Sequence, residues 1–258
     1  MPARFIDTHA HLGDDAFAND ADAVIAKALE AGVEKIIHPD VDSTERDAGL
    51  ALCKKYPGIM YHMIGLYPGS VTKDWKKEME LAEAAIGPDT VALGEIGLDY
   101  HWSIEFAAEQ KEAFKYQLAL AARLDLPVTI HLRDATDDFF AILEECRHLP
   151  LRGNVHAFSG SYETFARLQK YGPWKVGIGG VVTYKNAKVA AAVKDIPLES
   201  IVLETDSPYL PPVPYRGQRN DPTMIPIVAA KIAEIKGIDI EEVAQTTTAA
   251  AKELFTRL

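Results

Sequence analysis

The chain has 258 residues, of which 48% are hydrophobic and 25% charged, and its formal net charge is −11. This composition is typical of a globular protein and excludes a low-complexity or fibrous chain. The negative charge argues against a protein that coats nucleic acid nonspecifically through its whole surface. It leaves room for an enzyme in which bound cations and a few arginines make one cleft positive.

No stretch reaches the roughly 18 apolar residues of a membrane span, and the first residues enter a strand without the apolar core of a signal peptide. Cys53 and Cys146 stand far apart in segments that read as helices, which favours free thiols in a reducing compartment. We therefore expect a cytoplasmic protein without a membrane partner, and we expect it to be a monomer.

Apolar, β-rich runs alternate along the chain with segments of helical periodicity. The runs lie at residues 4–9, 33–38, 60–66, 91–96, 127–132, 153–158, 174–180 and 200–206. Helices are predicted over 21–31, ending at Gly32, and over 106–124. Asp221 before Pro222 predicts a helix start, and Asp239 with Glu242 three residues later is typical of a capping box.

Several of the apolar runs lack strict alternation, which is typical of strands buried on both faces of a parallel sheet. Eight such units predict an α/β fold, a (β/α)8 barrel of the TIM type with an appended C-terminal helix, in one domain over residues 1–258. The competing fold is a doubly wound open sheet. That fold usually has a glycine-rich phosphate loop after its first strand, where this chain has histidines.

The first strand is followed by His9 and His11. Alternate side chains of a strand share a face, so both imidazoles can point at one position. A neutral imidazole is a common metal ligand, and two of them form half of a chelating site. A His-x-His pair also arises easily by chance, so the interpretation depends on the later strands.

Four further strand ends carry candidate ligands: Glu95, His131, His156 and Asp206. In a barrel the carboxyl ends of all strands meet at one mouth. Each residue alone fits a hydrogen-bonded core histidine, a helix cap or an ion pair, but the set together predicts a metal site. Six ligands exceed one tetrahedral site, so we expect two divalent ions. Mixed nitrogen and oxygen ligands leave zinc, manganese and magnesium open.

The motifs around these residues resemble those of the TatD-family metal-dependent deoxyribonucleases, a branch of the amidohydrolase superfamily. They are D-T-H-A-H-L at 7–12, G-E-I-G-L-D-Y at 94–100, I-H-L-R-D-A at 130–135, H-A-F-S-G at 156–160, E-T-D-S-P-Y-L at 204–210 and R-G-Q-R-N at 216–220. The resemblance implies one metal held by His9, His11, Glu95 and Asp206. It implies a second held by Glu95, His131 and His156, with Glu95 bridging the two.

The resemblance also implies a phosphodiesterase that trims single-stranded or tailed DNA from its 3′ end. Two departures from the family stand out. Tyr67 replaces a histidine that often follows the third strand, and Ala10 and Ala157 stand where many relatives have cysteine. The Tyr67 change affects the expected rate and substrate preference rather than the metal site.

For catalysis, a two-metal site activates water and clamps the attacking and leaving oxygens. Glu95 serves as the expected bridge, and Asp206 is the candidate to orient the water or accept its proton. Pure metal ligation by Asp206 is an equally good interpretation, and the two roles can coexist.

Substrate contacts are predicted from guanidinium groups, which match phosphate oxygens bidentately, and from aromatic rings, on which bases stack. The candidates are Arg133, Arg216, Arg219, Lys185 and Tyr67, with Trp102 and Tyr209 as further stacking platforms. The alternatives are a solvated loop or ion-pair network for Arg216 and Arg219, an ion pair with Asp134 or Asp99 for Arg133, a helix start for Lys185 and simple packing for the aromatic rings.

Asp7 and Asp99 are expected behind the ligands. Asp7 is expected either to hydrogen-bond a ligand imidazole or to serve only the interior of the barrel as a buried residue. His38, His62, His101 and His148 are expected not to be ligands. Two competing functions remain. One is a small-molecule amidohydrolase such as a lactonase or phosphotriesterase, many of which have a carboxylated lysine where this chain has Glu95. The other is a catalytically silent, metal-stabilised scaffold.

Overall fold

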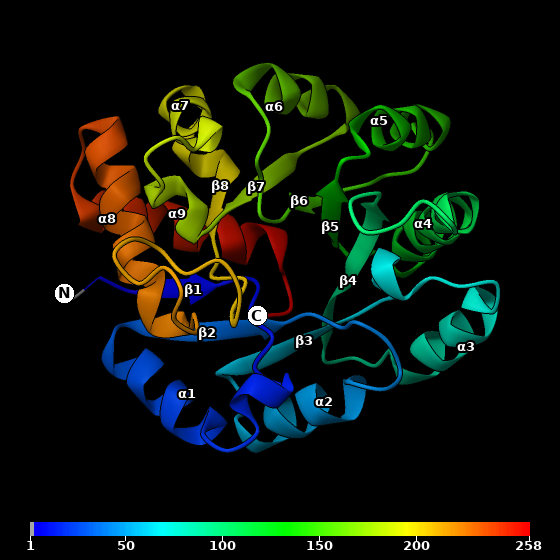
Figure 1. Ribbon diagram of the computed structural model, residues 1–258, viewed down its shortest axis with the longest axis horizontal. Helices are drawn as coiled ribbons and strands as arrows, with labels where there is room; N and C mark the ends of the chain where they lie inside the picture. Colours follow the sequence, from blue (N-terminus) through cyan, green and yellow to red (C-terminus); the bar gives the residue numbers. More distant parts are fainter. Residues whose placement is uncertain (1–2) are drawn as a thin grey trace.

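The computed structural model describes residues 3–258 and contains a parallel sheet of eight strands in the order of the sequence. The strands form the centre of the molecule in Figure 1, and the helices surround them. The strands are β1 (Phe5–Asp7), β2 (Val33–His38), β3 (Met60–Ile64), β4 (Thr90–Asp99), β5 (Val128–Arg133), β6 (Gly153–Val155), β7 (Trp174–Ile178) and β8 (Ile201–Leu203).

The last strand returns to the first, which makes the sheet a nearly closed barrel. The Thr8 amide donates to the Leu203 carbonyl at 2.9 Å, and Ala10 forms a parallel bridge with Ser207. The predicted (β/α)8 fold is therefore confirmed, and the carboxyl ends of the strands open on one mouth.

Helices occupy the connections between strands, as predicted, and a further helix follows the last unit. They are α1 (Ala21–Glu30), α2 (Arg46–Lys55), α3 (Trp75–Ala85), α4 (Ala107–Leu124), α5 (Thr136–Glu145), α6 (Tyr162–Leu168), α7 (Lys188–Asp195), α8 (Ile225–Lys236) and α9 (Ile240–Leu254). Short 3-10 helices span Asp15–Phe17, Pro68–Ser70, Gln169–Tyr171, Gly180–Thr183, Leu198–Ser200 and Pro222–Met224.

Two buried apolar clusters divide the core. The larger one lies between the strands and their covering helices. The smaller one joins β1, β2, β3, β4 and β8 to the appended helix α9 and its end; its buried members are Ile6, Ile37, Met63, Val91, Ala92, Val202, Ala250, Ala251, Leu254 and Phe255. Neighbouring strand residues such as Phe5 and Ile36 belong to the larger cluster, as the alternation of side chains requires. The appended helix thus closes the barrel at the end away from the mouth.

Some local details differ from the sequence predictions. Strands β1, β6 and β8 are only three residues long because the chain leaves the ladder to form the loops of the mouth. Asp221 caps the helix start through the Thr223 amide, as predicted. The capping box at Asp239 is wrong, since that side chain makes no cap hydrogen bond. Cys53 and Cys146 are free thiols. Across residues 3–258, no helix has the length and apolar character needed to span a bilayer.

Phe255 is fully buried where α9 meets the barrel interior. We expect Phe255→Ala to lower the free energy of unfolding by about 3–5 kcal/mol, because it removes buried apolar area and leaves a cavity. Urea unfolding measures the loss. Metal content should stay as in the wild type, since the change lies at the closed end of the barrel. A loss below about 1 kcal/mol would show that α9 does not seal the core.

Candidate metal centre and catalytic cavity

His9, His11 and Asp206 meet at the mouth of the barrel beside the seam between β1 and β8. The Nε2 atoms of the two histidines lie 3.1 Å apart, and each is 3.6 Å from Oδ1 of Asp206. The Asp206 amide donates to the His9 carbonyl at 2.8 Å, which holds the carboxylate beside the imidazoles. These three side chains form one group in which a metal ion could bind.

Glu95 joins this group to a second one. Its Oε2 lies 3.2 Å from Nε2 of His9 and 3.6 Å from Nε2 of His11. Its Oε1 lies 2.7 Å from Nδ1 of His131 and 2.8 Å from Nε2 of His156. Each carboxylate oxygen therefore faces a different pair of imidazoles, which is the arrangement expected of a bridging ligand.

The electrostatics of the centre favour anionic carboxylates. Burial raises the pKa of Glu95, but the His156 and His9 rings and the hydrogen bond from His131 outweigh it and hold that pKa well below its usual range. Burial also raises the pKa of Asp206, but the nearby His11 imidazole, followed by the His156 and His9 rings, brings that pKa below its ordinary value. Both side chains thus present negative charge near neutral pH.

The donor set fits divalent cations. Nitrogen faces nitrogen twice at 3.1 Å, between His9 and His11 and between His131 and His156. Two unprotonated imidazole nitrogens repel each other, whereas a cation between them satisfies both lone pairs. Carboxylate oxygens lie within reach of every pair, and nitrogen and oxygen donors together suit zinc or manganese better than magnesium.

Asp99 contacts a candidate ligand imidazole and Asp7 does not. Oδ2 of Asp99 lies 2.8 Å from Nε2 of His131, so Nδ1 of that ring faces the centre. The prediction that Asp7 contacts a ligand imidazole is wrong. Its carboxylate instead accepts the backbone amides of His9 and Thr205 at 3.2 and 3.0 Å, and the Thr205 hydroxyl at 2.6 Å. Asp7 is fully buried at the seam, where its hydrogen bonds join β1 to the segment that follows β8.

A buried ion pair that the sequence did not indicate supports Glu95. Oδ2 of Asp40 lies 2.8 Å from Nε of Arg46 and accepts the Gly65 amide at 3.1 Å. The Asp40 carbonyl accepts the Glu95 amide at 3.0 Å. Burial raises the pKa of Asp40 to about 6, although Arg46 opposes that shift. Asp40 thus ties the ends of β2, β3 and β4 together behind the bridging carboxylate.

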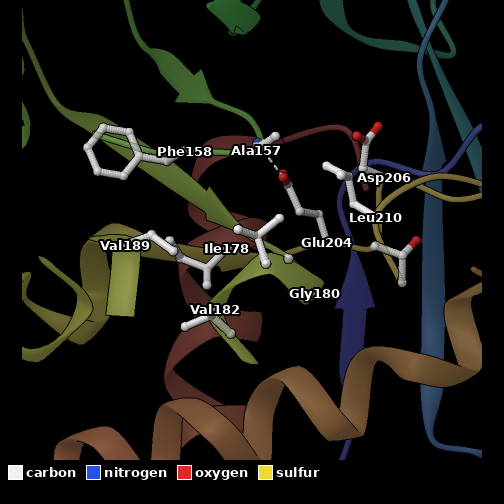
Figure 2. Close-up of a pocket in the computed structure, with 12 residues that line it drawn as sticks. Ala157, Phe158, Ile178, Gly180, Val182, Val189, Glu204, Asp206 and Leu210 are labelled. Carbon is white, nitrogen blue, oxygen red and sulfur yellow. Dashed lines mark hydrogen bonds between the residues drawn. The ribbon is translucent and has the colours of Figure 1, made fainter. Parts of the chain in front are cut away.

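Glu204 is a second missed residue. It lies one residue past β8 and is fully buried beneath the centre, and its Oε1 accepts the Ala157 amide (Figure 2). Burial, followed by the negative charges of Asp206, Asp7 and Glu95, raises the pKa of Glu204 well above its ordinary value, against the effect of the Ala157 amide. The available signal was its place in the E-T-D motif at 204–206.

A cavity of about 450 Å³ opens above the candidate ligands. Its wall carries Tyr67, Trp102, Arg133 and Tyr209. The alternative for Arg133, an ion pair with Asp134 or Asp99, is not formed: Asp134 pairs with His101 at 2.9 Å and Asp99 with His131 at 2.8 Å. The Arg133 guanidinium instead lies 5.3 Å above the centre of the Trp102 ring. Tyr67 donates its hydroxyl to Asp99 at 3.3 Å.

The structure does not bring the other predicted phosphate-binding residues to this cavity. Arg219 forms two contacts with Asp20, at 2.9 and 2.7 Å. Arg216 stacks over Tyr184 at 4.5 Å, and Lys185 is exposed in the turn before α7. None of the three lines the cavity, because the loop of residues 215–220 packs beside the α1 and α7 sides of the rim.

A sequence model of the family described as TatD related DNase matches residues 6–256. A Bacillus subtilis protein named "uncharacterized metal-dependent hydrolase YabD" is 39% identical over 96% of this chain and 98% of its own length. An Erwinia tasmaniensis protein named "3′-5′ ssDNA/RNA exonuclease TatD" is 31% identical over 96% and 98%.

The crystal structure of YjjV, a TatD homologue from Escherichia coli K12, superposes with a TM-score of 0.90 at 34% identity, covering 99% of each chain. A probable 2-pyrone-4,6-dicarboxylic acid hydrolase from Acinetobacter baumannii has a TM-score of 0.63 at 12% identity. That distant likeness shows the shared fold alone.

His38 lies beneath the mouth, where its Nδ1 is 3.2 Å from the Ala10 carbonyl oxygen. Burial lowers the pKa of His38 to about 3. In the unfolded chain a histidine titrates near 6.5. Below that pH the unfolded state binds a proton that the folded state rejects, so stability falls as the pH drops from about 6.5 toward 3.

We expect this single residue to cost the metal-stripped wild type about 2 kcal/mol of unfolding free energy between pH 7 and pH 5. The His38→Gln variant should lack that part of the loss when both are unfolded in urea at the two pH values. Replacement of the exposed His148 by glutamine is the matched control and should leave the pH dependence unchanged. An equal loss of unfolding free energy between pH 7 and pH 5 in the wild type and in His38→Gln would contradict the assignment of this loss to His38.

Proposed function

The chain belongs to the TatD related DNase family of metal-dependent hydrolases, and we propose that it hydrolyses phosphodiester bonds of nucleic acid. The expected reaction is 3′–5′ exonucleolytic cleavage of single-stranded or tailed DNA with two divalent ions. The Erwinia tasmaniensis relative, whose name states this polarity, supports the proposal. The observation that carries it is the bridging position of Glu95 at the floor of a cavity with one cationic and three aromatic side chains on its wall.

The cavity wall carries candidate recognition groups for the phosphate and the base of a nucleotide. Arg133 offers a guanidinium fork to a phosphate. Trp102 and Tyr209 are 77% and 52% exposed, so their rings are open to stack with bases. Base stacking tolerates any sequence, as trimming of arbitrary DNA ends requires.

Divalent ions held by the proposed ligands would supply Lewis acidity and lower the pKa of water. Asp206 faces the cavity as an anion and is positioned to orient the attacking water and accept one of its protons. The water oxygen forms a bond to phosphorus while the bond from phosphorus to the neighbouring sugar oxygen breaks. That sugar oxygen takes up a proton from solvent.

The test of the proposed function compares substrates of three classes with manganese or magnesium added. We expect the purified protein to shorten 3′-tailed DNA and to leave a panel of lactones and phosphotriesters unchanged. Cleavage of a lactone or phosphotriester in place of DNA would assign the centre to small-molecule hydrolysis. A lack of phosphodiester cleavage under every metal condition would overturn the proposal.

The Asp206→Asn variant tests the proton-accepting role. The amide keeps one oxygen donor but is not a base, so we expect kcat on DNA to fall by at least about 100-fold. Metal content, measured by elemental analysis, must stay at the wild-type level for the result to bear on chemistry. Wild-type turnover at full metal content would exclude an essential role for the Asp206 carboxylate.

Two arginine variants test whether DNA binds in the cavity or across the loop of residues 215–220, here called the outer loop. We expect Arg133→Met to raise KM for DNA by about tenfold or more, because it removes a charge-assisted phosphate contact. Arg219→Met is the matched control, since its guanidinium pairs with Asp20 outside the cavity. A larger KM effect from Arg219→Met than from Arg133→Met would show that DNA binds across the outer loop instead.

A further inference from the structure

The Glu204 carboxyl group occupies space that is free because residue 177 is a glycine. A Cβ added at Gly177 of β7 would collide with the Glu204 carboxyl group. Next to the carboxyl is a cavity of about 10 Å³ whose other walls include Ile178, Val182 and Val189 (Figure 2). A space of that size admits no substrate group. An acid kept in such apolar surroundings at the end of β8 needs a reason other than packing, because burial of a carboxyl group is costly.

One end of the carboxyl group fixes the turn after β6. Oε1 of Glu204 accepts the amide of Ala157, the residue that follows His156 (Figure 2). Ala157 has a φ of +43°, a left-handed conformation that is unfavourable for a residue with a side chain. The hydrogen bond from β8 therefore stabilises the strained turn that aims His156 at the centre.

The same carboxyl group faces the far side of the His156 ring. Nε2 of His156 lies 2.8 Å from Glu95, on the side of the proposed metal centre. Its Nδ1 lies 4.0 Å from Oε1 of Glu204. Both His156 Nδ1 and Glu204 Oε2 are buried without a hydrogen-bond partner among residues 3–258. The unpartnered nitrogen and the carboxyl group are complementary if the nitrogen carries its proton.

We propose that Glu204 is a positioning residue for His156, acting through the Ala157 turn and through the Nδ1–H of the imidazole. The inference rests on the proposed metal centre. A movement of roughly 1 Å shortens the 4.0 Å between Nδ1 and Oε1 to a hydrogen bond of about 3 Å. With the proton held on Nδ1, the Nε2 lone pair points at the cation.

In His131, the other histidine of this ligand group, the two ring nitrogens have exchanged places relative to those of His156. Nδ1 of His131 faces Glu95, and Nε2 of that ring lies 2.8 Å from Asp99. A carboxyl group behind a ligand imidazole fixes its orientation and makes it a better donor, and removal of such a group typically costs about 10- to 100-fold in metal affinity. Glu204 and Asp99 thus act on the two histidines of the second ligand group, one each.

Calorimetric titration of manganese into the chelator-stripped protein tests the proposal. We expect Glu204→Leu to weaken the binding step that uses His156 by about 10- to 100-fold and to leave the other step near its wild-type affinity. Glu204→Gln keeps a carbonyl oxygen as acceptor and should recover most of the loss. Val202→Ala is the control, since it removes buried volume two residues before Glu204, from the apolar cluster that β8 forms with α9.

A second readout is the imidazole N–H resonance of His156 in the zinc-loaded, nitrogen-15-labelled protein. In the wild type and in Glu204→Gln this proton should be shifted downfield and exchange slowly. In Glu204→Leu it should exchange fast or move upfield. If the leucine variant does not fold, the wild-type resonance decides, because a rapidly exchanging proton there overturns the proposal.

Wild-type affinity for both manganese ions in Glu204→Leu, with only the loss of melting temperature that Val202→Ala also shows, would reduce Glu204 to a structural role. Metal binding and N–H exchange are measured without substrate. A failure to cleave DNA would therefore defeat the proposed function and leave this inference standing. Wild-type manganese affinity in Glu204→Leu would defeat this inference and leave the proposed function standing.

Discussion

The closure of the barrel between β1 and β8 is the constraint on which the centre depends. Asp7 of β1 accepts hydrogen bonds from the amides of His9 and Thr205 and from the Thr205 hydroxyl. The two contacts with Thr205 join residues 198 positions apart, and Asp7 and Thr205 lie two residues and one residue from the proposed ligands His9 and Asp206. Since Asp7 has no exposed surface, water cannot replace those donors, and loss of the seam would separate His9 from Asp206.

A buried ion pair holds the part of the barrel that carries Glu95. Asp40 and Arg46 form a buried pair whose backbone and side-chain contacts reach Gly65 and Glu95. A buried ion pair contributes little net stability compared with apolar packing, so its value here is geometric. Glu95 must present one oxygen to each pair of imidazoles, and a shift of about 1 Å in its strand would break that symmetry. The polar groups behind the mouth thus serve orientation, while the apolar clusters and α9 supply stability.

The sequence predicted the barrel and the meeting of six candidate ligands because parallel topology brings all strand ends to one rim. It could not predict the contacts that depend on register across the seam. Asp7 was assigned to an imidazole, although its partner Thr205 comes 198 residues later. Arg219 was assigned to phosphate, but its guanidinium group binds Asp20, which lies 199 residues earlier in the chain. Glu204 was missed because the chain leaves β8 at Leu203 and Asp206 has a φ of +57°, so strand alternation no longer tells which side chain points inward.

The net charge of −11 bears on how such a protein would bind a polyanion. Nucleic-acid binding through a broad basic face draws most of its affinity from released counterions. This cavity offers one arginine, with Glu45, Glu95 and Asp206 also on its wall. Diffuse attraction is therefore small. On the proposed function, binding would depend on cations at the floor and on stacking on Trp102 and Tyr209, which bases reach only in a single strand, because a stacked duplex does not expose its base faces. The proposed function thus implies a frayed or single-stranded terminus as the substrate rather than an intact double helix.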